Sequence, residues 1–168
     1  MHSGVTKITD EARRHLITLI EDVCRMKNYM EETLFLACSL VDRYLVHIVL
    51  AKQATPCLIR LAIIATLIAA KLEQPIQPSY IKMVKLIAHE WKVDIDVQEL
   101  YDLEQSIIFV LDFDLRYEGP IFFLGRFLRI YGLDQVRQDK DSFLVDYLAR
   151  KFCRLLLRSR EYLMLRPS

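Results

Sequence analysis

The fold of this chain is decided by the stretch Glu32-Thr33-Leu34-Phe35-Leu36-Ala37-Cys38-Ser39-Leu40-Val41-Asp42-Arg43-Tyr44-Leu45. At helical spacing its apolar positions form one stripe, made up of Leu34, Ala37, Cys38, Val41 and Leu45 and continued by Ile48. The adjacent charges Asp42 and Arg43 lie beside this stripe, where an unpaired charge is costly, so we expect them to be anchored to another element. The stretch therefore predicts an amphipathic helix whose charges Asp42 and Arg43 are paired with another element. The alternative is an ordinary helix of a helical bundle, which would carry the same apolar stripe.

The composition is typical of a compact helical protein without a strong charge. The chain has 168 residues, 53% of them hydrophobic, with only 4 Gly and 5 Pro. Its 23 Lys and Arg nearly balance 22 Asp and Glu, which gives a formal net charge of +1. This balance argues against binding to nucleic acid or to an anionic membrane, and we interpret the basic residues near the C-terminal end as a solvated helix face.

The sequence indicates a soluble intracellular protein. Its cysteines, Cys24, Cys38, Cys57 and Cys153, show no CxxC spacing and are interpreted as reduced residues. The N-terminus has no basic segment followed by an apolar run, and the longest apolar stretch, residues 61–70, is shorter than the ~20 residues that span a bilayer. We therefore expect the protein in the nucleus and cytoplasm, with no membrane partner.

Five helices are predicted in the first two thirds of the chain. The first helix is capped by Thr9 and runs to about Lys27, and the second is the stretch quoted above. The third begins at Thr55-Pro56 and runs to about Lys71. The fourth covers roughly residues 79–88, and the fifth is capped by Asp94 or Asp96. The third is apolar on nearly all sides, so we expect it to be the buried central helix. Because no alternating strand pattern of convincing length occurs, the fold class is predicted to be all-α.

Two further helices are predicted after Gly119-Pro120. One covers residues 120–131 and ends at Gly132, and the other runs from about residue 142 to 158, with an extension toward Leu165. Two helices cannot enclose a core of their own. We therefore expect their apolar positions to pack on the first domain, on another chain or on further sequence.

Three motifs resemble those of the cyclin family. The stretch that opens this section is similar to the second helix of a cyclin box, whose pattern is close to E-T-L-x-L-A-x-x-x-x-D-R-[FY]-L, and its aspartate indicates the cell-cycle rather than the transcriptional type. Ala69-Ala70-Lys71-Leu72-Glu73 is similar to A-S-K-F-E-E, and Val110-Leu111-Asp112-Phe113-Asp114-Leu115 is similar to V-L-x-F-D-L. The resemblance implies a five-helix cyclin box with a central buried helix over residues 8–117, and we expect residues 1–7 before it to be disordered. Residues 118–168 would then form two helices of an incomplete second cyclin fold, or a C-terminal helical tail.

The resemblance also assigns roles to two pairs of charges. It implies that Arg13 pairs with Asp42 and so ties the first helix to the second. It implies that Lys71 and Glu104 bridge each other and together hold backbone groups of the regulatory helix of a cyclin-dependent protein kinase, with Glu104 near the start of the fifth helix. The other residues implied to contact the kinase are Leu72, Glu73, Phe113 and Leu115. Without the resemblance, Lys71 and Glu104 would be interpreted as a structural bridge between neighbouring helices.

The substrate-docking patch of the family is degenerate in this chain. Cyclins present Met, Ile, Leu and Trp side chains of the first helix, with residues early in the third, to R-x-L segments of substrates. The corresponding residues here are Ala12, His15, Leu16, Leu19 and Ile59. This smaller surface lacks the large aromatic ring, which argues against R-x-L docking.

No motif of an enzyme, cofactor site or metal site is found. The four histidines are scattered, and the sequence has no HExxH, GxGxxG, GxxxxGK[ST] or GxSxG. The resemblance implies a regulatory subunit that binds and activates a cyclin-dependent protein kinase in cell-cycle control, with no cofactor. Two alternatives stay open: a cyclin-fold scaffold, and a module similar to transcription factor B, neither of which activates a kinase. Self-association through the C-terminal helices is a further option.

Overall fold

The structure, a computed structural model, describes residues 9–133 and 140–159, with side chains from residue 143 onward in the last helix. The elements of this described part are all helices: α1 (Asp10–Lys27), α2 (Glu31–Leu50), α3 (Leu58–Glu73), α4 (Tyr80–Trp91), α5 (Val97–Val110), α6 (Pro120–Ile130) and α7 (Lys140–Leu157). The predicted all-α fold class is therefore confirmed. The segment 1–7 that was expected to be disordered, and the extension toward Leu165, lie outside the described residues.

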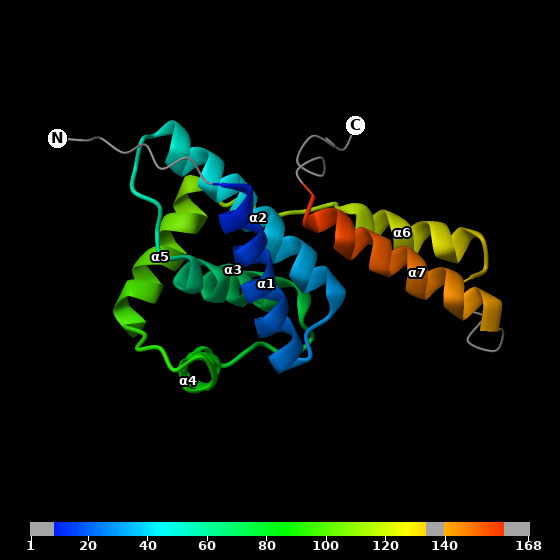
Figure 1. Cartoon of the computed structure of the whole chain (residues 1–168), viewed down its shortest axis with the longest axis horizontal. Coiled ribbons are helices and arrows are strands. Elements are labelled where there is room, and N and C mark those ends of the chain that lie inside the picture. The colour runs from blue at the N-terminus through cyan, green and yellow to red at the C-terminus, as the bar shows by residue number, and fades with distance from the viewer. Residues whose placement is uncertain (1–8, 134–139, 160–168) are drawn as a thin grey trace. The chain divides into compact units, whose positions relative to one another are not determined.

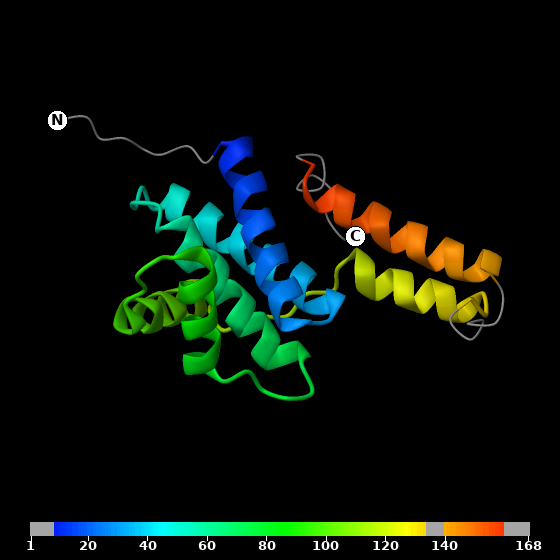
Figure 2. The same ribbon diagram turned by 60° about the horizontal axis from the view of Figure 1, so that its bottom comes forward.

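The chain divides into two compact units, Met1–Arg116 with α1 to α5 and Tyr117–Ser168 with α6 and α7. Figures 1 and 2 show α3 in the middle of the first unit, where it packs against α1, α2 and α5. Every residue of α3 from Leu61 to Ala70 is buried, and the hydroxyl of Thr66 is satisfied by donating to the carbonyl of Ala62 at 2.7 Å. The prediction of a buried central helix is confirmed, because a helix that is apolar on all sides is stable only when neighbours cover all of them.

Local side chains explain several of the helix ends. Thr9 caps α1 by accepting a hydrogen bond from the backbone N–H of Ala12, and Asp96 caps α5 by accepting one from Gln98. The predicted start of the third helix was wrong by two residues, since α3 begins at Leu58 and Thr55 and Pro56 lie in the preceding connection. A hydroxyl followed by proline marks a helix start only to within a residue or two.

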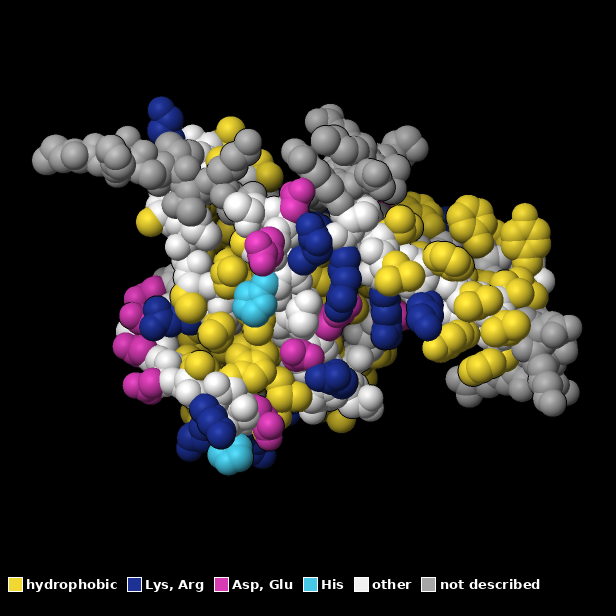
Figure 3. Space-filling view, viewed as in Figure 1, with side chains coloured by type: hydrophobic (Ala, Val, Ile, Leu, Met, Phe, Trp, Pro, Cys, Tyr) yellow, Lys and Arg dark blue, Asp and Glu magenta, His cyan; other side chains and the backbone are white. Residues whose placement is uncertain are grey.

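The second unit pairs α6 with α7. Ile121, Leu128 and Leu157 are buried in it, but many large apolar side chains stay exposed. Yellow hydrophobic surface covers much of the two helices in Figure 3. Each of the two helices covers only one side of the other, which agrees with the prediction that two helices cannot enclose a core of their own.

The helix α2 has the length and hydropathy that would suffice to cross a membrane, the only one to do so among the described residues. Within its most apolar window, 61% of the residues are buried inside the protein. Core helices commonly combine this length and composition, and most apolar side chains of α2 are buried, although Val46 and Leu50 near its end are exposed.

Candidate functional site

Lys71 and Glu104 form an ion pair between the last turn of α3 and the middle of α5. The Lys71 Nζ donates to the Glu104 Oε1 at 2.5 Å. The Lys71 side chain is 37% exposed and that of Glu104 only 11%, so the lysine is the more accessible member of the pair. The expectation that Glu104 lies near the start of its helix was wrong: it lies halfway along α5, because this is the part of α5 that packs on α3.

Two tyrosines surround this pair and were missed from the sequence. Tyr80, the first residue of α4, places its ring 5.9 Å from the Lys71 Nζ, and it stacks on Tyr101 of α5 with ring centroids 4.4 Å apart and planes 4° from parallel. The hydroxyl of Tyr80 is buried and has no hydrogen-bond partner in the described part of the chain. Lys71, Glu104, Tyr80 and Tyr101 are called the ion-pair cluster below. Neither tyrosine belongs to a motif, so only the tertiary packing of α4 reveals them.

The remaining residues implied to contact a kinase are spread over two segments. Leu72 and Glu73 follow Lys71 at the end of α3; Leu72 is 54% exposed, and burial together with Glu32 raises the pKa of the Glu73 carboxyl. Phe113 and Leu115 follow α5, whose last residue lies about 9 Å along the helix axis from Glu104. Phe113 is 64% exposed, whereas Leu115 is half-buried.

Phe109 is a further exposed aromatic residue that the sequence interpretation missed. Its ring meets the edge of the Phe113 ring with centroids 5.4 Å apart, and it is 66% exposed. Helical spacing gave no signal for this contact, because Phe113 lies beyond the end of α5 and has a left-handed backbone conformation. The two rings together present an apolar surface at the end of α5.

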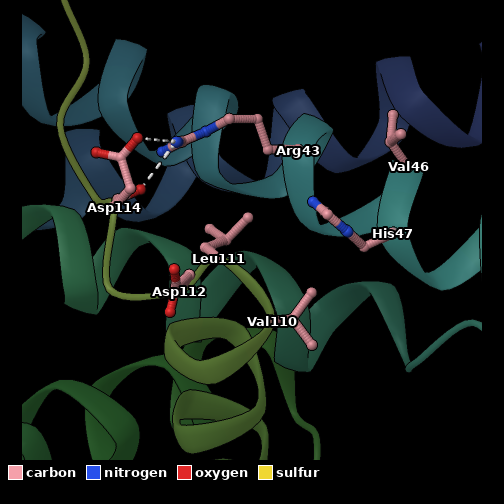
Figure 4. A pocket seen from close by; sticks show the side chains of 7 residues that line it. All are labelled: Arg43, Val46, His47, Val110, Leu111, Asp112 and Asp114. Carbon is pink, nitrogen blue, oxygen red and sulfur yellow. Dashed lines mark hydrogen bonds and ion pairs between the residues drawn. The ribbon is translucent and has the colours of Figure 1, made fainter.

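Arg43 holds the segment that carries Phe113 and Leu115. Its Nη1 donates to the backbone carbonyl oxygen of Asp114 at 2.8 Å, as Figure 4 shows. Asp112 and Phe113 adopt left-handed backbone conformations, with φ of 50° and 58°, which turn the chain back toward α2. Beside this turn lies an open pocket of about 350 Å³, lined by Arg43, Val46, His47, Val110, Leu111, Asp112 and Asp114. The predicted anchoring of Arg43 to another element is confirmed.

Arg43 itself gives a ligand in this pocket little to bind. The Nε and Nη2 of Arg43 are buried and have no hydrogen-bond partner among the described residues, and burial lowers the pKa of Arg43. Because these two nitrogens are covered by protein atoms, they do not offer their protons to the pocket. We therefore assign Arg43 a structural role in fixing the turn.

Arg13 and Asp42 are brought together between α1 and α2. The Arg13 Nε and Nη2 donate to the two carboxylate oxygens of Asp42, both at 2.8 Å. The side chains are 9% and 16% exposed, so this pair faces the interior of the unit. Such a two-point pair fixes the orientation of one helix on the other.

One residue of the degenerate docking patch does not reach the surface. Leu16 is fully buried in the core, so its assignment to an exposed patch was wrong. It lies one helical turn before Ile20, on the buried face of α1. His15 is exposed, and Ala12, Leu19 and Ile59 are partly exposed.

The chemistry of the site is that of binding. Among the residues that the structure describes, no three His, Cys, Asp or Glu side chains gather as metal ligands. Burial raises the pKa of the Cys38 thiol well above its usual value, which keeps this sulfur from acting as a nucleophile. What the ion-pair cluster offers is an accessible ammonium group for carbonyl oxygens, next to a carboxylate that accepts from N–H groups.

One protein family and several known proteins are similar to this chain. Residues 1–116 match the model of the cyclin N-terminal domain. The chain is 30% identical over 161 residues to the G2/mitotic-specific cyclin-B3 of Gallus gallus, and the matched region covers 96% of this chain and 36% of that protein. It is 31% identical over 134 residues to the G2/mitotic-specific cyclin cig1 of Schizosaccharomyces pombe (79% of this chain, 31% of that protein). It is 31% identical over 168 residues to Cyclin-A1-2 of Arabidopsis thaliana (100% of this chain, 36% of that protein). The chain thus spans about a third of the length of these curated relatives.

Proposed function

Because the chain belongs to the cyclin family, we propose that it binds and activates a cyclin-dependent protein kinase in cell-cycle control. Cyclins are regulatory proteins and not enzymes, so the activity in question is that of the partner. The single observation that carries the proposal is the Lys71–Glu104 pair, which joins the two residues that the resemblance implies would hold the kinase. The two similar proteins named as G2/mitotic-specific cyclins support a role in cell division.

The pair is suited to hold the end of a partner helix. A helix end leaves backbone carbonyl or N–H groups without partners. The Lys71 ammonium has three donors, of which Glu104 takes one, and more than a third of the side chain is exposed. Lys71 can therefore donate to carbonyl oxygens of a partner while Glu104 keeps it in place.

Activation would follow from selective binding. A cyclin adds no chemical group to the kinase but binds the conformation whose regulatory helix is turned inward, and so raises the population of that state. In that conformation the kinase forms its own Lys–Glu pair, which positions the phosphates of ATP. We also propose that the protein acts in the nucleus and cytoplasm, where reduced cysteines such as the buried Cys24 and Cys38 are stable.

The test is a titration of kinase activity over a panel of cyclin-dependent kinases. The wild type should activate at least one of them, and the double variant Lys71→Ala/Glu104→Ala should not, while circular dichroism shows that it stays folded. The chain offers a matched control, because Arg60 of α3 and Glu99 of α5 form a second ion pair between the same two helices, also at 2.5 Å. The variant Arg60→Ala/Glu99→Ala should activate like the wild type.

Other outcomes decide between the alternatives. Equal activation by the wild type and the Lys71→Ala/Glu104→Ala variant would remove the assignment of this site. If no protein activates any kinase, the scaffold alternative is favoured. Salt-dependent DNA binding by the wild type would favour the module similar to transcription factor B.

A further inference from the structure

We propose that Tyr80, backed by Tyr101, is a positioning residue of the Lys71–Glu104 pair, fixing the Lys71 ammonium in the place where a partner helix would meet it. The inference rests on the proposed function and extends it to a helix, α4, to which the site assignment gave no role. Its basis is the geometry of the ion-pair cluster, which joins α3, α4 and α5.

The ring of Tyr80 limits where the Lys71 side chain goes. Lysine carries its charge on a flexible four-carbon stem, and holding such a side chain still costs conformational entropy. In the structure the Lys71 Nζ contacts Glu104 at 2.5 Å and lies 5.9 Å from the centre of the Tyr80 ring. A cation at this distance from an aromatic face is attracted by it. The carboxylate and the ring together restrict the ammonium group to few orientations. The Lys71 side chain therefore loses less conformational entropy when a partner binds.

Tyr101 keeps the Tyr80 ring in place. The two rings are nearly parallel, at 4° and 4.4 Å between centroids, and they come from different helices. Tyr80 begins α4, so the stack also fixes the start of this helix against α5. Stacked rings are rigid side chains, and a rigid neighbour positions a lysine better than a flexible aliphatic one would.

The hydroxyl of Tyr80 is not required for this role. It is buried without a hydrogen-bond partner among the described residues, and burial with the nearby Glu104 raises the pKa of Tyr80 above its usual value. The ring therefore stays neutral beside the ion pair. It follows that Tyr80→Phe retains the positioning, whereas Tyr80→Leu loses it.

The first measurement needs no partner. Protons of the Lys71 ε-methylene group should show an upfield ring-current shift in the NMR spectrum of the free protein. The shift should persist in Tyr80→Phe and disappear in Tyr80→Leu. The variant Tyr131→Leu, which removes an exposed tyrosine of the second unit, serves as the control and should leave the shift unchanged.

The second measurement is kinase affinity in a double-mutant cycle. Tyr80→Leu should weaken binding about fivefold, the magnitude of one exposed cation–π contact, while Tyr80→Phe and Tyr131→Leu bind within about twofold of the wild type. In a Lys71→Ala background Tyr80→Leu should have no further effect, because its influence passes through the lysine.

Two results would overturn the proposal. One is a Lys71 shift that is absent in the wild type or unchanged in Tyr80→Leu. The other is an equal loss of affinity from Tyr80→Leu with and without Lys71, which would mean that the tyrosine supports the fold in general. If the wild type binds no cyclin-dependent kinase, the proposed function fails, and the ring-current shift alone decides whether Tyr80 positions Lys71.

Discussion

Arg13 and Asp42 meet through two parallel hydrogen bonds, with both N–O distances at 2.8 Å, although they lie 29 residues apart in the sequence. Both side chains are largely removed from water. A buried charge whose partner is taken away keeps its desolvation penalty without its compensation. The pair therefore makes the packing of α1 on α2 depend on both residues together.

Removing either partner should destabilise the first unit strongly. We expect Arg13→Ala and Asp42→Ala each to lower the free energy of unfolding by about 3–5 kcal/mol, measured by urea denaturation. The double variant should lose less than the sum of the two, because no charge is then left alone.

An exposed pair within the same helix provides the control for this experiment. Arg25 and Asp22 are 2.7 Å apart in α1, with side chains 79% and 34% exposed. Arg25→Ala should cost no more than about 1 kcal/mol. An Arg13→Ala variant as stable as Arg25→Ala would contradict the structural role of the buried pair.

The raised pKa of Glu73 predicts a pH-dependent effect on stability. Burial and the charge of Glu32 raise the pKa of the Glu73 carboxyl in the folded state. Between its ordinary and its raised pKa the folded protein binds more protons than the unfolded chain, so this group makes stability fall as pH rises through that interval. Glu73→Gln should therefore make the protein more stable than the wild type at pH 7. The difference should vanish below about pH 4, where Glu73 is protonated in the unfolded chain as well as in the folded protein.

Denaturation of the wild type and Glu73→Gln at both pH values measures this effect. Glu32→Gln should reduce the difference at pH 7, because it removes the second cause of the shift. A Glu73→Gln variant that is less stable than the wild type at pH 7 would show that the carboxylate is stabilising and would refute the prediction.

The exposed apolar face of α6 and α7 predicts self-association of this chain. Phe127 of α6 and Phe152 of α7 are 57% and 64% exposed. An apolar surface as extensive as the one on these helices in Figure 3 is uncommon on a monomer. Sedimentation velocity should show a mass that grows with concentration, and Phe127→Glu/Phe152→Glu should give a monomer. Phe109→Glu, which adds a charge at a phenylalanine of the first unit that is 66% exposed, should leave the association unchanged. A wild type that stays monomeric at all concentrations would contradict the prediction.

Sequence reasoning succeeded where a local rule decides the structure. The all-apolar helix α3 could only be buried, and cap residues such as Thr9 fix a helix start through one nearby hydrogen bond. Gly132, just beyond α6, has a positive φ of 69°, which glycine adopts without strain and which ends the helix as predicted. Each of these features depends on a few neighbouring residues.

The sequence failed where tertiary packing decides. The family resemblance placed Leu16 in a surface patch, whereas helical spacing puts it on the same face of α1 as the buried Ile20 and Val23, and this face is turned to the core. Tyr80 and Tyr101 are 21 positions apart and carry no signal of stacking until α4 and α5 are placed together. The contact of Lys71 with Glu104 came from the family pattern, but the cluster around it came only from the structure, and the kinase-binding role of these residues stays a prediction.

The assignment of Leu72 to the kinase interface can be tested against a closely matched residue. Leu72 is 54% exposed and Ile81 of α4 is 56% exposed, and neither belongs to the core. Substitution by alanine at either position should change the free energy of unfolding by no more than about 0.5 kcal/mol, because little buried surface is lost.

Kinase binding should separate the two variants. Leu72 lies next to Lys71 in the last turn of α3, and the resemblance to cyclins implies that both residues contact the same partner. Burying an exposed leucine side chain is worth about 1.5–3 kcal/mol. We expect Leu72→Ala to weaken the affinity for the kinase roughly tenfold or more, while Ile81→Ala binds like the wild type. Calorimetry measures this affinity with the kinase that the wild type activates in the panel. Equal losses in both variants would mean that the interface extends over α4 and is not centred on the end of α3. No loss in either would exclude Leu72 from the interface, since an exposed leucine that a partner buries must contribute to its affinity.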